Sequence, residues 1–121
     1  MFKAAYSPGM TAATAEPIDA VLRALSDPTR RRVLERLGRG GASVSELAAP
    51  FDMALPSFVQ HLRLLEESGL VESRKAGRVR TYRLAPGRLR VLEDWLAEQR
   101  RLWETRLDQL DAYLMNLKEK Q

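Results

Sequence analysis

The sequence predicts a mainly helical α+β fold, with a short antiparallel hairpin placed before one long terminal helix. Four segments before Gly69 carry helical spacing or helix start signals, and two short strand-like runs follow this glycine. The chain has 121 residues, of which 45% are apolar, so it fits one domain of ordinary size with a core of its own. It contains no cysteine, which excludes disulfides and thiolate chemistry.

The distribution of charge points to a polyanionic partner. The formal net charge is +4 and the isoelectric point is about 9.8. Acids and bases balance in residues 1–17 and again in residues 88–121, so the whole positive excess lies in residues 18–87. Within that block, residues 73–83 include five bases and no acid. A basic segment of this kind is typical of proteins that bind nucleic acids.

Residues 1–17 are rich in Ala, Thr, Ser, Gly and Pro without a period, and we predict that they form a flexible N-terminal arm. The sequence has no continuous apolar stretch of the kind found in a signal peptide or a membrane span. We therefore expect a cytoplasmic protein that does not enter membranes.

Two helices should open the domain. Apolar residues recur at helical spacing from Ile18 and predict a first helix over residues 18–26. Asp27 and Pro28 mark the start of a second helix, over residues 28–37. A carboxylate at this place can cap the first turn, and the N–H that proline lacks has no partner at a helix start.

A short third helix and a longer fourth one follow. Ser43 with Glu46 matches a capping box, and Ser45 can also cap, so the sequence leaves the first residue of the short helix open. The fourth helix is predicted over residues 56–68 and is ended by Gly69 in the left-handed conformation. Its apolar stripe should face the core and comprises Leu55, Phe58, Leu62 and Leu65.

After Gly69 the period of the sequence changes. Residues 70–74 and 79–84 predict two strands joined by a turn, and residues 88–118 predict one long charged helix. Two helices joined by a tight turn and followed by a basic hairpin form a winged helix-turn-helix. We therefore divide the chain into the arm at residues 1–17, a winged helix-turn-helix domain at residues 18–87 and a dimerisation helix at residues 88–121.

The outer face of the fourth helix predicts contacts with DNA bases. The N-terminal end of such a helix enters the major groove, and Ser57 and Gln60 lie on the outward face at that end. A carboxamide can make two hydrogen bonds to adenine, and a hydroxyl can bond a base edge or a phosphate. His61 and Arg63 flank this face, where we expect phosphate contacts. The alternative is that these residues are only the solvated face of an amphipathic helix.

The hairpin carries the other predicted contacts with the DNA backbone. Arg78 lies nearest the turn and can reach a minor groove, whereas three bases should follow the phosphates: Arg74, Lys75 and Arg80. The alternative is a hairpin whose Lys and Arg only protect an edge strand. A run of bases without acids is less expected of that alternative, because mixed charge solubilises equally well.

The terminal helix has the pattern of a dimer interface. Apolar residues recur at alternating three- and four-residue steps and form a seam of Leu96, Trp103, Leu107, Leu110, Leu114 and Leu117. A second copy of the chain would cover this seam, and Val21 and Leu25 of the first helix can join the interface. The aromatic residues Trp95, Trp103 and Tyr113 are more simply explained as interface or core residues than as a ligand site.

Several motifs together resemble the bacterial ArsR-type (ArsR/SmtB) transcriptional regulators. They are Leu25-Ser26-Asp27-Pro28-Thr29-Arg30, Val44-Ser45-Glu46-Leu47-Ala48, the run QHLRLLEESGLV at residues 60–71, Gly77-Arg78 and Tyr82-Arg83-Leu84. The resemblance spans residues 18–84. It implies a homodimeric repressor in the bacterial nucleoid that binds a double-stranded operator with two-fold symmetric half-sites. It also implies release by an effector, whose identity the sequence leaves open, a small molecule included.

The resemblance further implies where metal-sensing members hold their metal. Their ligands are cysteines on the short third helix, or histidines and carboxylates on the last helix. This chain has no cysteine, and its single histidine, His61, lies on the helix that should read DNA. Because soft and borderline metals need Cys or His ligands, we expect no metal and no cofactor.

Two other classes of function were weighed against a repressor. An enzyme is not expected, because the chain has one histidine, no cysteine, no glycine-rich phosphate loop and no clustered pair of acids. The alternative is a winged-helix interaction module that docks a partner protein through its long terminal helix. A stable heterocomplex that survives high salt, without binding to an operator, would distinguish that module.

Overall fold

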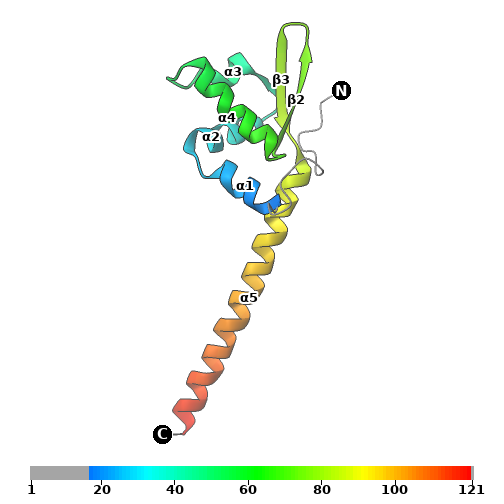
Figure 1. Ribbon diagram of the computed structural model, residues 1–121. Coiled ribbons are helices and arrows are strands. Elements are labelled where there is room, and N and C mark those ends of the chain that lie inside the picture. Colours follow the sequence, from blue (N-terminus) through cyan, green and yellow to red (C-terminus); the bar gives the residue numbers. More distant parts are fainter. Residues whose placement is uncertain (1–16, 121) are drawn as a thin grey trace. The chain divides into compact units, whose positions relative to one another are not determined.

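The computed structural model describes residues 17–120 and confirms the predicted mainly helical α+β, winged helix-turn-helix fold. In these residues the elements follow the chain as α1 (Pro17–Leu25), α2 (Pro28–Leu37), β1 (Ala42–Ser43), α3 (Val44–Ala48), α4 (Leu55–Glu67), β2 (Val71–Ala76), β3 (Val79–Leu84) and α5 (Pro86–Glu119) (Figure 1). The predicted arm lies outside the described residues, apart from Pro17, which opens α1.

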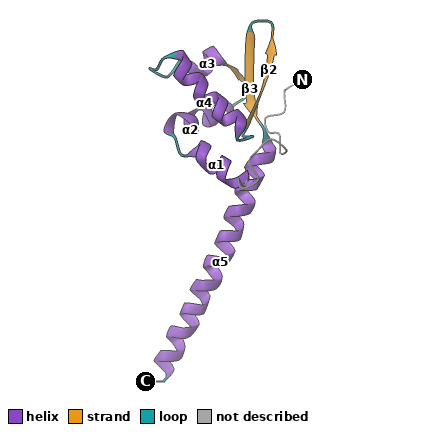
Figure 2. Cartoon of the chain, in the orientation of Figure 1, coloured by secondary structure: helices purple, strands orange, loops and turns teal. Residues whose placement is uncertain are grey.

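The chain divides into two compact units whose boundary falls between Val91 and Leu92, within α5. The first unit holds α1 to α4, the sheet and the first turns of α5, and Figure 2 shows its helices and strands by colour. The second unit is the remainder of α5. This boundary lies a few residues beyond the predicted one between residues 87 and 88, because the first turn of α5 packs on the domain, with the side chain of Arg88 beside Gly69.

Local capping explains where α2 and α3 begin. The side chain of Asp27 accepts a hydrogen bond from the backbone N–H of Arg30 at 3.0 Å, and Pro28 occupies the first turn, as predicted. At α3 the structure selects Ser43 rather than Ser45 as the cap. Ser43 Oγ accepts from the N–H of Glu46 at 3.2 Å, and Glu46 Oε1 accepts from the N–H of Ser43 at 3.1 Å, which completes a capping box.

The sheet has three antiparallel strands in the order β1-β3-β2. The predicted hairpin is confirmed as β2 and β3, but β1 was not predicted. This two-residue strand pairs Ala42 with Tyr82 and Ser43 with Thr81, so its partner lies about forty residues further along the chain. The pairing joins the start of α3 to the strands of the wing.

Two glycines adopt backbone conformations that other residues rarely take. Gly69 ends α4 with a φ of 82°, as predicted, and a Cβ at this residue would lie 2.5 Å from Cγ of Arg88. Gly77 has a φ of 64° and occupies the first place of the two-residue turn between β2 and β3. Such turns match the twist of the strands, and they require a positive φ.

The core of the first unit lies between α4, the other helices and the sheet. Phe58, Leu62 and Leu65 of α4 are fully buried, and the ring centroid of Phe58 lies 5.3 Å from that of Phe51. The other helices and the sheet contribute further buried apolar residues, namely Val21, Ala24, Val33, Leu37, Ala42, Leu47, Leu70, Val71 and Tyr82. Packing against this core fixes the orientation of α4 and leaves its opposite face exposed.

Candidate nucleic-acid interface

Helix α4 has one buried face and one exposed face, and the predicted base-reading residues lie on the exposed one. Ser57, Gln60 and Arg63 are exposed, whereas Phe58, Leu62 and Leu65 are buried. In Figure 1 the N-terminal end of α4 and the turn of the β2–β3 hairpin both lie on the side of this unit away from α1.

The start of α4 differs from the starts of α2 and α3. No side chain caps it, and its first turn, like that of α2 but not that of α3, carries no acidic residue. The first N–H groups of a helix have no partner within the helix, and its partial positive charge favours anions. The first turn of α4 therefore presents backbone N–H groups and holds no carboxylate of its own.

Leu55 is not a core residue, in contrast to our prediction. It is the first residue of α4, and 56% of its surface is exposed. Helical spacing places it in line with the buried stripe, but the buried part of the stripe begins one turn later, at Phe58. The neighbouring residues Ala54 and Pro56 are exposed as well.

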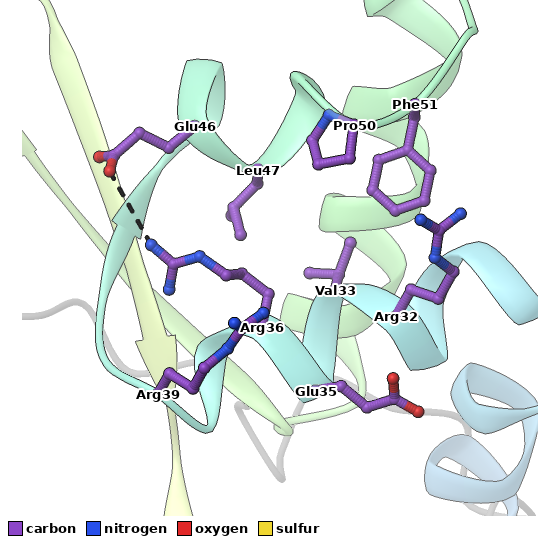
Figure 3. A pocket seen from close by; sticks show the side chains of 9 residues that line it. All are labelled: Arg32, Val33, Glu35, Arg36, Arg39, Glu46, Leu47, Pro50 and Phe51. Atoms are coloured by element: carbon purple, nitrogen blue, oxygen red, sulfur yellow. Dashed lines mark ion pairs between the residues drawn. The ribbon is translucent and has the colours of Figure 1, made fainter.

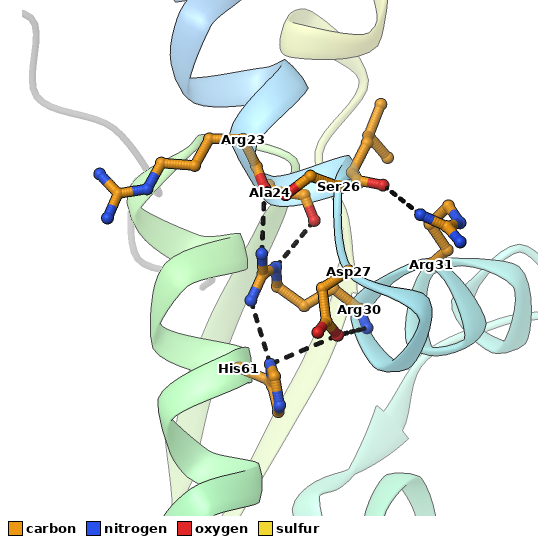
Figure 4. Close-up of polar contacts among 8 residues, drawn as sticks. Arg23, Ala24, Ser26, Asp27, Arg30, Arg31 and His61 are labelled. Atoms are coloured by element: carbon orange, nitrogen blue, oxygen red, sulfur yellow. Dashed lines mark hydrogen bonds and ion pairs between the residues drawn. The ribbon is translucent and has the colours of Figure 1, made fainter.

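His61, for which we predicted a phosphate contact, lies beside polar side chains of its own domain. Figure 4 shows its ring beside Arg30 and Asp27, at the junction of α1 and α2. Its Nδ1 lies 3.1 Å from Nη1 of Arg30 and 3.7 Å from Oδ2 of Asp27, and only 22% of its side chain is exposed. Because a guanidinium only donates, its contact with Nδ1 is a hydrogen bond in the tautomer that leaves Nδ1 without a proton.

Asp27 is held as a carboxylate in the same cluster. Burial acts to raise its pKa, but the hydrogen bond from the N–H of Arg30 and the nearby charges of His61 and Arg30 lower the pKa below its usual value. Arg30 also donates from Nε to the carbonyl of Ala24 at 2.8 Å and from Nη2 to that of Arg23 at 3.0 Å. The cluster therefore connects the end of α1, the start of α2 and the middle of α4.

The arginines of the wing have two different environments. Arg74, Lys75 and Arg78 are exposed around the turn. Arg80, for which we predicted a phosphate contact, is half-buried, and its Nη1 donates to Oγ of Ser73 at 2.8 Å. The Ser73 hydroxyl is buried and donates to Oε2 of Glu66 on α4, also at 2.8 Å. This chain of bonds joins the hairpin to the reading helix.

An ion pair and a buried tyrosine lie in the stem of the wing. Arg83 and Glu72 face each other in the register of β2 and β3, and Nε of the arginine lies 2.6 Å from Oε1 of the glutamate. Tyr82 is buried, which raises its pKa, and the charge of Glu66 raises it further. Its phenol therefore stays neutral in the core. Because Arg83 is paired with Glu72, the positive charge of the wing is concentrated near the turn.

A small hollow of about 180 Å³ lies between α2 and α3 (Figure 3). Val33, Leu47 and other apolar residues line it, and arginines of α2 lie around it. Arg32 lies over the ring of Phe51, with 4.7 Å from its Cζ to the ring centroid, and Nη2 of Arg36 lies 3.9 Å from Oε2 of Glu46. The second contact joins α3 to α2, and the first joins the loop after α3 to α2.

Comparisons with known proteins agree with this geometry. A family model described as a helix-turn-helix domain matches residues 25–74. The HTH-type transcriptional regulator Rv2034 of Mycobacterium tuberculosis is 42% identical over 74 residues, which are 61% of this chain and 69% of that protein. The transcriptional repressor SdpR of Bacillus subtilis is 30% identical over 63% of this chain and 84% of its own length.

Solved structures give the same assignment. A crystal structure of an ArsR family transcriptional regulator has 55% sequence identity and a TM-score of 0.72, and the match covers 74% of this chain and 98% of that one. An ArsR-like regulator from Rhodococcus sp. RHA1 has 35% identity and a TM-score of 0.67, over 78% of this chain and 89% of that one.

The chain belongs to the ArsR family. It is a DNA-binding transcriptional regulator of the winged helix-turn-helix class, and its relatives are regulators rather than enzymes. ArsR-family regulators bind DNA operators, which favours the DNA-binding hypothesis over the interaction module.

In this ArsR-family chain, α5 has no buried residue along its 34 residues. The six residues of the predicted seam are all exposed, from Leu117 at 42% to Trp103 at 66%. Leu25 of α1 is half-buried. Val21, by contrast, is fully buried in the core of the first unit, so its side chain leaves no surface for a partner copy.

A metal site in a protein needs a set of side chains that can act as ligands together. The chain has no cysteine, and within residues 17–120 no three His, Asp or Glu side chains come together as a set of metal ligands. Among the described helices, none is long and apolar enough to cross a membrane.

Proposed function

We propose that this chain is a homodimeric ArsR-family repressor that reads an operator of two symmetric half-sites. In this proposal, residues 18–87 form the DNA-binding domain and residues 88–121 the dimerisation helix. Ser57 and Gln60 contact base edges in the major groove, and the exposed bases of the wing contact the backbone.

The observation that carries the proposal is the exposure of Ser57 and Gln60 on a helix whose other face is completely buried. Because Phe58, Leu62 and Leu65 anchor α4 in the core, these two side chains hold a defined direction before DNA arrives. The uncapped start of α4 supports the same docking, since it presents N–H groups and no acid to the phosphates.

Contacts with the DNA backbone are assigned to exposed bases only. Arg63 flanks the reading face, and Arg74, Lys75 and Arg78 surround the turn of the wing. Neutralising phosphates with such residues gives affinity that does not depend on sequence and falls with salt. In this proposal Arg80 and His61 are positioning residues. Arg80 bonds the wing, and His61 bonds α4, to the rest of the domain.

Dimerisation through α5 explains why a long helix exposes so many apolar side chains. A single helix of this kind gains little stability from its own hydrogen bonds and is normally stabilised by packing of its apolar stripe. The seam from Leu96 to Leu117 has the spacing of a paired helix. Two-fold symmetry would then present the two reading helices about 34 Å apart, one turn of DNA.

The signal that releases the operator is not a thiolate-bound metal in this proposal, because the chain has no cysteine. A small-molecule effector fits the family's mode of regulation.

The test is a binding measurement on operators selected from random duplex DNA. We expect matched half-sites and a steep decrease of affinity with salt. Gln60→Ala should lose about 1–3 kcal/mol of discrimination between bases at one position of each half-site. Arg78→Ala should weaken binding to all sequences evenly. Selection that recovers no common sequence, together with equal binding by wild type and Gln60→Ala, would refute the repressor.

A further inference from the structure

The exposed start of α4 is apolar, and the base-reading residues proposed above do not use it. Ala54, Leu55 and Pro56 are consecutive and exposed, and none of their side chains can donate or accept a hydrogen bond. Leu55 is the largest of the three, with 56% of its surface exposed. In a helix the Cα–Cβ bonds tilt towards the N-terminus, so the side chain of its first residue projects beyond the end of the helix.

The position of Leu55 cannot be explained by packing within the domain. The buried stripe of α4 starts at Phe58, one turn later, and the ring of Phe58 is covered by Phe51. Ser57 and Gln60, by contrast, lie on a face of α4 that carries hydrogen-bonding groups. The tip of the helix thus combines an apolar end with a polar side.

The major groove offers a matching pattern of groups. Base edges there present hydrogen-bond donors and acceptors, and the apolar group among them is the 5-methyl of thymine. A leucine at the tip of a helix that enters the groove can cover such a methyl group. A carboxamide one turn and a half further along the same helix reads a different edge.

We propose that Leu55 recognises the 5-methyl group of a thymine in each half-site of the operator. This inference rests on the proposed function, because it requires α4 to lie in the major groove. It adds a third specificity-determining residue to Ser57 and Gln60, and it identifies the chemistry read at one position as an apolar contact.

The test replaces each thymine of a selected operator by deoxyuridine, which removes only the methyl group. For the wild-type protein, one position in each half-site should lose affinity by about fourfold, the effect of removing one buried methyl group. At all other thymines the affinity should stay within the error of the measurement. Leu55→Ala should bind the unmodified operator more weakly by a similar or larger factor.

The decisive comparison combines the two changes. For Leu55→Ala, deoxyuridine at the sensitive position should cause no further loss, because the contact is already absent. Leu102→Ala is the matched control, since it removes the same side chain from an exposed position of α5, and it should keep the full sensitivity to deoxyuridine. The melting temperatures of both variants establish that they are folded.

Two results would overturn the inference while leaving the proposed function intact. One is specific binding by the wild-type protein that no deoxyuridine substitution weakens. The other is a Leu55→Ala protein that is as sensitive to deoxyuridine as the wild type. A wild-type protein that binds no operator at all would overturn both proposals.

Discussion

The two units of this chain satisfy their apolar residues in different ways. In the first unit, side chains from each of the helices α1 to α4, including Val21, Val33 and Phe58, are buried by other parts of the same chain. In the second unit, residues 92–119 of α5 include no buried side chain, although leucines and tryptophans recur along them. The first unit therefore packs its apolar side chains around its own core, whereas the apolar side chains of the second are left for the partner copy that we propose.

The largest expected effect comes from opening the core of the first unit. Phe58→Ala should lower the free energy of unfolding by about 3–5 kcal/mol, because it leaves a cavity that the surrounding residues cannot fill. A loss of this size is a large part of the stability of an ordinary domain. Denaturant unfolding measures it, and the loss should be the same at low and high protein concentration. A loss below 1 kcal/mol would contradict the description of α4 as the centre of the core.

A change in the second unit should act on assembly instead. Leu110→Glu replaces an exposed leucine of the seam by a charge in both copies, and it should weaken the dimer by about 3 kcal/mol or more, at least a hundredfold in dissociation constant. Sedimentation at several concentrations measures the change. The matched control is Ala112→Glu, which adds the same charge on the opposite side of α5 and should leave the dimer intact. Equal effects of the two variants would exclude the seam as the interface.

The wing allows the same comparison on a smaller scale, between a side chain that bonds inside the domain and one that does not. Arg80→Ala should cost about 1.5 kcal/mol of stability, because it removes a charge-assisted hydrogen bond to the buried Ser73. Arg78→Ala should leave stability unchanged and lower the salt dependence of DNA binding by about one ion for each protomer. Thermal unfolding and salt titrations separate the two. If Arg80→Ala lowered the salt dependence and left stability unchanged, our assignment of Arg80 would be wrong.

The smallest expected effect concerns the cap of α2. The pKa of Asp27 is lowered in the folded state, so its contribution to stability is complete above the usual carboxyl value near pH 4 and is lost as the pH falls through the lowered value. Asp27→Ala should lose about 1 kcal/mol at pH 7, and the difference from wild type should diminish below about pH 4. Asp27→Asn keeps a capping oxygen and should remove most of this pH dependence. Unfolding measured from pH 7 to pH 2.5 tests both variants.

The sequence predicted those features of the fold that depend on neighbouring residues. The cap at Asp27 and the left-handed Gly69 involve contacts within a few positions of each residue, so their sequence signals were sufficient. The strand β1 could not be predicted, since two residues pair with a strand about forty positions later. Its only local signal was the capping box at Ser43.

The candidate site was predictable in its exposed part and not in its internal contacts. The spacing of α4 placed Ser57 and Gln60 on the outer face, and they are exposed. His61 and Arg80 looked like the other bases in the sequence, because nothing in the sequence shows that Arg30 or Ser73 lies within hydrogen-bonding distance. Leu55 was assigned to the core because helical periodicity does not indicate where the core ends.

The central claim is that the first unit reads one half-site and that α5 joins two such readers. The most direct measurement compares the affinities of wild type and Leu110→Glu for a complete operator and for a single half-site. We expect the wild type to bind the complete operator at least a hundredfold more tightly than a half-site, and Leu110→Glu to bind both with the weak affinity of the half-site. A monomeric Leu110→Glu protein that kept wild-type affinity for the complete operator would contradict it.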